Sequence, residues 1–120
     1  MIDAKALLII YSNALNRFDL KRVEAMFAPH AIYISPGLDG EIINRDQIMK
    51  SFRSYFAEFA DQTSEYFNIE LILPNAVRSN WKLSATSNKT GKRVSRSGSE
   101  IMKFDDHGLI IHVEVHDNVG

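Results

Sequence analysis

The sequence predicts a single α+β domain in which a curved antiparallel sheet wraps, like a cone, over three N-terminal helices. Three observations support this fold class. The 120 residues are enough for one domain, residues 1–120, and too few for two. Helical periodicity dominates the first half of the chain, and long alternating strands dominate the second. A curved sheet that packs over helices leaves a pocket between the two layers, so we expect one small-molecule cavity.

Three segments show the periodicity of helices. Residues 2–17 carry apolar side chains at every third or fourth position. Asp19 can cap a second, shorter helix, which we expect Pro29 to end. Asn44 and Gln47 form a variant capping box that opens a third helix. The apolar positions of that third helix are Ile48, Met49, Phe52, Tyr55, Phe56 and Phe59.

The remaining segments alternate with the period of strands. A first strand at residues 31–35 is followed by a turn-rich loop at residues 36–40. Turn residues also predict hairpin connections in the second half of the chain, so that the last three strands form a meander. The long strands are expected at residues 66–73, 77–88, 93–104 and 109–117.

The composition excludes several classes of function. A net charge of −1 gives no long-range attraction toward nucleic acid or an anionic membrane. The absence of cysteine excludes a disulfide framework and thiolate chemistry. The apolar run at residues 6–10 fits an amphipathic helix better than a signal peptide, and no stretch approaches the ~20 apolar residues of a membrane span. We therefore expect a cytoplasmic protein.

The chain carries three local strings, Tyr11-x-x-Ala14-Leu15-Asn16-x-x-Asp19-Leu20, Met26-Phe27-Ala28-x-x-Ala31 and Phe104-x-x-x-Gly108-x-Ile110. In their order and spacing they resemble the nuclear transport factor 2-like superfamily. That superfamily includes ketosteroid isomerases, SnoaL-like polyketide cyclases, scytalone dehydratase and the association domain of calcium/calmodulin-dependent kinase. The resemblance implies a cystatin-like cone fold and a homodimer formed through the outer face of the sheet. It implies less about activity, because this fold hosts enzymes, binding proteins and oligomerisation modules.

The resemblance also implies candidate catalytic residues. Ketosteroid isomerases bind a developing oxyanion with a tyrosine and a neutral carboxylic acid, and these positions fall on Tyr11 and Glu100. Their catalytic base, an aspartate before a proline, falls on Ser35, which cannot shuttle a proton between carbons without a partner base. Steroid isomerisation is therefore not expected. SnoaL-like cyclases often carry an aspartate near the end of the last strand, which implies Asp117 as the base.

Side-chain alternation predicts which residues line the pocket. If Val113 and Val115 face inward, Asp117 does too. Arg96 would also face inward and would need a carboxylate there, either Glu100 or an anionic ligand. A bulge at residues 97–99 would shift this parity. The expected lining is Ser35, Phe52, Phe56, Trp81, Leu83, Arg96, Met102, Phe104, Val113 and Val115.

Two functions are compatible with these residues. In the first, a cofactor-independent isomerase, cyclase or dehydratase transfers a proton next to a carbonyl: Asp117 accepts the proton, and Tyr11 and Glu100 stabilise the enolate oxygen. In the second, Tyr11 is a core tyrosine, Glu100 pairs with Arg96, and the protein is a non-catalytic binding or dimerisation module. The many aromatic residues favour a small apolar, ring-containing ligand in either case.

No cofactor or metal is expected. The sequence has no Gly-rich phosphate loop, zinc pattern or nucleophile elbow. His112, Glu114 and His116 share one face of the last strand, but the two histidines would lie ~13 Å apart, too far to bind one ion. We expect this face, with Ile110, to lie outside the pocket at a dimer interface.

Overall fold

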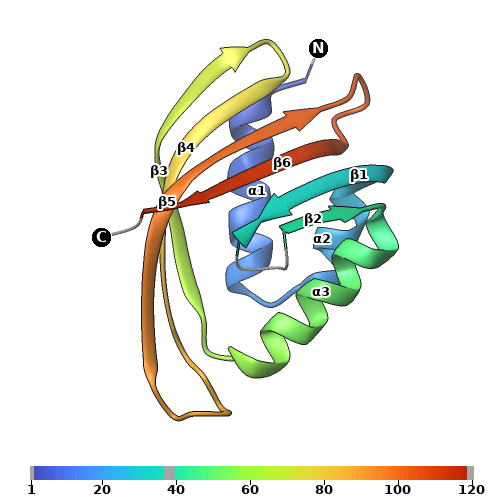
Figure 1. Ribbon diagram of the computed structural model, residues 1–120. Coiled ribbons are helices and arrows are strands. Elements are labelled where there is room, and N and C mark those ends of the chain that lie inside the picture. The colour runs from blue at the N-terminus through green and yellow to red at the C-terminus, as the bar shows by residue number, and fades with distance from the viewer. Residues whose placement is uncertain (1, 37–39, 119–120) are drawn as a thin grey trace.

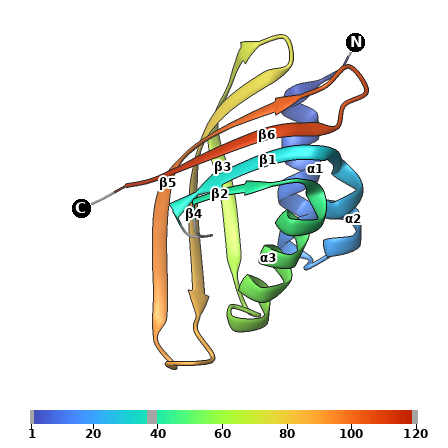
Figure 2. The ribbon, with the colours of Figure 1, turned by 45° about the vertical axis from the view of Figure 1, so that its right-hand side comes forward.

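The computed structural model describes residues 2–36 and 40–118, so residues 37–39 of the predicted loop lie outside the described residues. Within the described part, six strands form one mixed sheet in the order β2-β1-β6-β5-β4-β3. Figures 1 and 2 show the three helices together on the concave side of this curved sheet. The α+β cone fold is therefore confirmed. The elements are α1 (Ala4–Asn16), α2 (Leu20–Met26), β1 (Phe27–Ser35), β2 (Gly40–Ile43), α3 (Arg45–Glu58), β3 (Thr63–Leu73), β4 (Ala76–Thr86), β5 (Arg93–Phe104) and β6 (Ile110–Asp117).

Short polar side chains begin all three helices. The side chain of Asp3 accepts a hydrogen bond from the backbone N–H of Ala6 at 3.1 Å and so caps α1. Asp19 and Asn44 cap α2 and α3 in the same way, as the sequence predicts. These caps satisfy amide groups that have no partner inside the helix. None of the described helices is long and apolar enough to cross a membrane.

The end of α2 differs from the prediction. Pro29 was expected to end this helix, but α2 ends at Met26 and Phe27 already begins β1 with extended backbone angles. Phe27 is fully buried in the core, so packing favours the strand conformation at this position. Pro29 lies in an irregular stretch of β1, between Phe27 and Ile32, where the pairing with β6 shifts register. A residue without an N–H is tolerated at such an irregularity.

Two features of the sheet were not predicted. β1 pairs with β6 in parallel, so the sheet is mixed rather than wholly antiparallel. β2 is a four-residue strand that pairs with β1, whereas the sequence analysis places residues 36–40 in a loop and assigns residues 41–43 to no element. Four residues are too few to show period-two alternation, and the pattern of one strand does not reveal the direction of its neighbour.

The register of the long strands fixes which side chains face the helices. β4 and β5 pair continuously from Ala76–Lys103 to Thr86–Arg93, so no bulge interrupts residues 97–99. Glu100 and Arg96 therefore share the concave side with Trp81 and Leu83, as alternation predicts.

The pairing of β5 with β6 shifts register at one place, between Lys103 and Phe104. Ile110 is consequently fully buried in the core, and the prediction that it shares the outer face with His112 is wrong.

Candidate functional site

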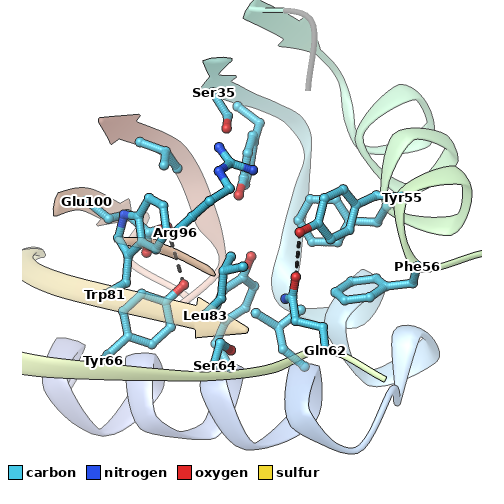
Figure 3. Close-up of a pocket in the computed structure, with 15 residues that line it drawn as sticks. Ser35, Tyr55, Phe56, Gln62, Ser64, Tyr66, Trp81, Leu83, Arg96 and Glu100 are labelled. Atoms are coloured by element: carbon cyan, nitrogen blue, oxygen red, sulfur yellow. Dashed lines mark hydrogen bonds between the residues drawn. The ribbon is translucent and has the colours of Figure 1, made fainter. Parts of the chain in front are cut away.

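A cavity of about 100 Å³ opens between the concave face of the sheet and the helices. Figure 3 shows side chains from β1, α3, β3, β4 and β5 converging on it. Its size is of the order of an engineered cavity that accommodates benzene. The residues of the predicted site that line it are Tyr11, Ser35, Phe52, Phe56, Trp81, Leu83, Arg96, Glu100 and Val115.

Four members of the predicted site lie elsewhere. Met102, Phe104 and Val113 face the concave side but are fully buried in the packed core, because the strands run on from the cavity into the layer packed under the helices. Asp117 does not line the cavity; it lies at the strand end and lines an adjoining open hollow that shares Ser64, Leu83 and Arg96 with the cavity. The cavity thus holds two of the three predicted catalytic side chains, Tyr11 and Glu100.

The sequence analysis also missed part of the wall. Three tyrosines are the chemically important additions, and alternation could have found two of them. Tyr33 lies two residues before Ser35 on β1, and Tyr66 pairs directly with Trp81 across β3 and β4. The additional lining residues are Leu15, Tyr33, Tyr55, Gln62, Ser64 and Tyr66.

Glu100 lies at the inner end of the cavity, where it is 2% exposed. Its Oε1 accepts a hydrogen bond from the Tyr66 hydroxyl at 3.3 Å, and its buried Oε2 has no hydrogen-bond partner among the described residues. Burial disfavours the carboxylate and raises the pKa of Glu100 to about 8, although the hydrogen bond from Tyr66 lowers it. At neutral pH Glu100 is therefore mainly a carboxylic acid that can donate a hydrogen bond.

Three tyrosines surround this acid. Burial raises the pKa of Tyr11, Tyr33 and Tyr66, so all three hydroxyls stay neutral. The buried Tyr11 hydroxyl makes no hydrogen bond of normal geometry within residues 2–36 and 40–118, although it interacts electrostatically with Tyr33, Tyr66 and Glu100. The inner end of an otherwise apolar cavity thus gathers hydroxyl donors and a neutral acid. Such a set can stabilise a developing oxyanion.

The outer end of the cavity carries the opposite electrostatic character. The guanidinium of Arg96 forms an ion pair with Asp117, through Nη2 and Oδ2, and lies 5.9 Å above the Trp81 ring. Figure 3 shows the Arg96 side chain extended across the cavity. The sequence analysis expects Glu100 or an anionic ligand as the partner of Arg96, whereas the side chain that pairs with it in the structure is Asp117. Asp117 Oδ1 is buried and has no hydrogen-bond partner among the described residues.

Tyr55 completes this outer end. Its hydroxyl donates a hydrogen bond to Gln62 Oε1 at 2.5 Å, which Figure 3 marks. Burial raises the pKa of Tyr55, whereas the neighbouring Arg96 lowers it. Asp117 raises the same pKa.

Gly98 determines the position of the Trp81 ring. A Cβ on Gly98 would lie 2.8 Å from the Trp81 ring and 1.8 Å from the backbone oxygen of His116. The missing side chain lets the indole lie against β5, where its Nε1 donates to the backbone oxygen of Ser99 at 2.9 Å. Gly98 therefore shapes the cavity wall through the position of Trp81.

No group of three His, Cys, Asp or Glu side chains in the described part of the chain is arranged to hold a metal ion. On the outer face of β6, His116 Nε2 instead lies 3.0 Å from Glu114 Oε2.

The arrangement of helices and curved sheet is the nuclear transport factor 2-like fold. Within it, the SnoaL-like domain matches residues 10–113, and the chain belongs to this SnoaL-like family. No curated protein matches the sequence.

Solved structures share the fold over nearly the whole chain. AclR from Streptomyces galilaeus is 24% identical, with a TM-score of 0.80 over 96% of this chain and 88% of its own. SalBIII, an epoxide hydrolase/cyclase-like enzyme with a role in pyran ring formation in the polyether salinomycin, is 17% identical, with a TM-score of 0.85 over 97% and 91%. RV0760c from Mycobacterium tuberculosis, in complex with estradiol-17beta-hemisuccinate, is 14% identical, with a TM-score of 0.84 over 97% and 94%. At these identities the likeness establishes the fold alone.

Proposed function

We propose that the protein is a cofactor-independent enzyme that transfers a proton at a carbon next to a carbonyl, in a small and largely apolar ring compound. The observation that carries the proposal is the neutral, buried Glu100, whose Oε2 lacks a partner in the described structure and which lies among tyrosine hydroxyls. A hydrogen-bond donor kept out of water in this way stabilises an oxyanion more strongly than it would at the surface.

The two ends of the cavity would have different roles: the inner end would stabilise the oxyanion, and the outer end would transfer the proton. The substrate carbonyl oxygen lies at the inner end and accepts hydrogen bonds from Glu100 and Tyr11. Asp117, at the outer end, takes a proton from the adjacent carbon as the electrons move onto the oxygen, and then returns it to the same or a conjugated carbon. Arg96 holds Asp117 in position for this transfer. The proton is conserved, and no oxidant or reductant is needed.

Two of the solved structures support a ring-containing ligand. SalBIII acts in the formation of a ring, and RV0760c was crystallised with a ring-containing ligand. Aromatic residues on the wall of this cavity, Phe52, Phe56 and Trp81, suit a ligand of that shape.

A second candidate is a non-catalytic binding protein of the same fold. The observation that favours it is that Asp117 does not line the cavity and already pairs with Arg96. The cavity would then hold a ring compound, and Glu100 would donate a hydrogen bond to it without proton transfer.

Proton exchange separates the two candidates. We would incubate the protein with 2-tetralone, a small ketone with acidic α-protons, in deuterated buffer and follow loss of the α-proton signals by NMR. The proposal expects exchange to fall by roughly 10²–10⁴-fold in Asp117→Asn and by roughly 10²-fold in Tyr11→Phe. Asp106→Asn, which changes an exposed carboxylate in a turn, serves as the matched control.

Binding of 4-nitrophenol, a one-ring analogue of an enolate, would be followed in the same variants by its absorbance. Exchange that is equal in the wild type and Asp117→Asn, with 4-nitrophenol still bound, would exclude the enzyme and favour the binding protein.

A further inference from the structure

We propose that the natural ligand is an acid: an apolar ring compound whose carboxylate, or similarly acidic oxygen, binds Arg96 at the outer end of the cavity. This inference rests on the proposed function in so far as both place one ring compound in the cavity. It adds the charge of the ligand, which the proton-transfer chemistry does not require.

Arg96 differs from the other arginines that form ion pairs in the described structure. The Arg78–Glu70 and Arg93–Asp61 pairs are more than half exposed on both sides, with side-chain exposures of 54% and 64% in the first and 56% and 51% in the second. In the Arg96–Asp117 pair these values are 28% and 25%. Arg96 also points into an apolar cavity, where an arginine needs anionic partners to offset its lost hydration.

The guanidinium of Arg96 has N–H groups that the ion pair with Asp117 does not use. A guanidinium carries five N–H groups; the ion pair with Asp117 runs through Nη2, and Arg96 also hydrogen-bonds the Tyr55 hydroxyl, so further N–H groups remain. The charge of Arg96 reaches into the cavity, because it lowers the pKa of both Tyr55 and Tyr33. An anionic oxygen that enters the cavity would therefore meet the remaining N–H donors of a planar guanidinium, a group that suits a carboxylate.

The wall of the cavity favours an anion over a cation. Arg96 and Glu100 are its two ionisable side chains apart from tyrosines, and Glu100 is mainly neutral at pH 7 because burial raises its pKa. Arg96 thus carries the only full charge of the lining at pH 7, and its partner Asp117, which partly neutralises it, does not line the cavity. Asp117 holds Arg96 at the outer end of the cavity but competes with a ligand for the same guanidinium.

Two ligands of equal shape test the inference. Benzoate and benzamide share one ring and a planar substituent and differ in charge at pH 7. Their dissociation constants would be measured by ligand-observed NMR for the wild type, Arg96→Met and Asp117→Asn. Arg93→Gln is the matched control, because Arg93 lies on the same strand with an exposed carboxylate partner, Asp61.

We expect the wild type to bind benzoate about tenfold more tightly than benzamide. Arg96→Met removes this preference, and Arg93→Gln retains it. Asp117→Asn strengthens benzoate binding by a further factor of about ten, because the competing carboxylate is gone, and leaves benzamide unchanged. Equal binding of benzoate and benzamide by the wild type would overturn the inference, and this result does not depend on whether Arg96→Met folds. A preference for benzoate that survives in Arg96→Met would also overturn it. Benzoate binding that is no tighter in Asp117→Asn would refute the competition.

The two proposals fail separately. The proposed enzyme loses proton exchange in Asp117→Asn, whereas anion recognition becomes stronger in the same variant. A protein that prefers benzoate but exchanges no protons of 2-tetralone leaves anion recognition standing and refutes catalysis. A protein that exchanges the protons of 2-tetralone but does not prefer benzoate leaves catalysis standing and refutes anion recognition.

Discussion

Replacing Glu100 with glutamine should make the protein more stable, and increasingly so as the pH rises. Glu100 is 2% exposed and has a pKa of about 8, compared with an ordinary value of 4.5. The cause is burial, which penalises the charged form. Glutamine has nearly the shape of a protonated glutamic acid and cannot ionise.

The sign follows from the number of bound protons. Below pH 4.5 the carboxyl is protonated in both the folded and the unfolded chain, so it causes no pH dependence. Between pH 4.5 and about 8 the folded chain keeps a proton that the unfolded chain has released, and stability therefore falls as the pH rises. Above pH 8 both states are ionised and the loss is complete.

The magnitude follows from the same two pKa values. Each pKa unit corresponds to about 1.4 kcal/mol, so the full loss is about 5 kcal/mol, of which roughly 3 kcal/mol is reached by pH 7. A domain of this size has a total stability of about 5–15 kcal/mol. One buried carboxyl thus accounts for a large fraction of it.

The assay is urea unfolding of the wild type and Glu100→Gln across this pH range. Other titrating groups cancel in the difference between the two proteins. We expect the difference to be near zero at the acid end and to grow to several kcal/mol in favour of Glu100→Gln at pH 8. Glu70→Gln, on the exposed side of β3, serves as a control with no comparable trend. A difference that stays constant with pH would refute the assignment of a neutral buried acid.

Three further predictions concern the surroundings of the cavity. Tyr66→Phe removes the hydrogen bond that lowers the pKa of Glu100, so the pH midpoint of the stability loss should move upward, as measured by the same unfolding series. Gly98→Ala should destabilise the protein by roughly 3 kcal/mol or more, because its Cβ would overlap the neighbouring strand, and the fluorescence of Trp81, the sole tryptophan of the sequence, should change. We also propose that the protein is a homodimer through the outer face of its sheet: sedimentation should show a dimer that Ile101→Asp dissociates, whereas a wild type that sediments as a 13.6 kDa monomer at micromolar concentration would contradict the proposal.

The parts of the fold that depend on local chemistry were predictable from the sequence. Asp19 and Asn44 cap helices because a short polar side chain satisfies free amide groups wherever it precedes an apolar helical pattern. Alternation along β5 correctly placed Arg96 and Glu100 on the concave side, because the register with β4 is unbroken.

The parts that depend on distant segments were not predictable. Alternation gives the direction of a side chain but not how far along the strand the cavity extends. Met102 and Phe104 therefore share the orientation of Glu100 yet lie in the packed core. The pairing of Arg96 with Asp117 likewise depends on how β5 and β6 align, because Asp117 lies opposite Gly98 in that register. A sequence pattern contains no such information.

The cost of Glu100 to stability is itself an argument about function. A glutamine or an apolar residue at this position would avoid the loss that accumulates above pH 4.5, and structural needs alone would favour such a residue. Groups that cost stability in the folded state are expected where they serve binding or chemistry. The neutral acid at the inner end and the guanidinium of Arg96 at the outer end would then define one ligand. That ligand has an oxygen that accepts hydrogen bonds, an apolar ring beside Trp81, and an anionic group at the side that faces Arg96.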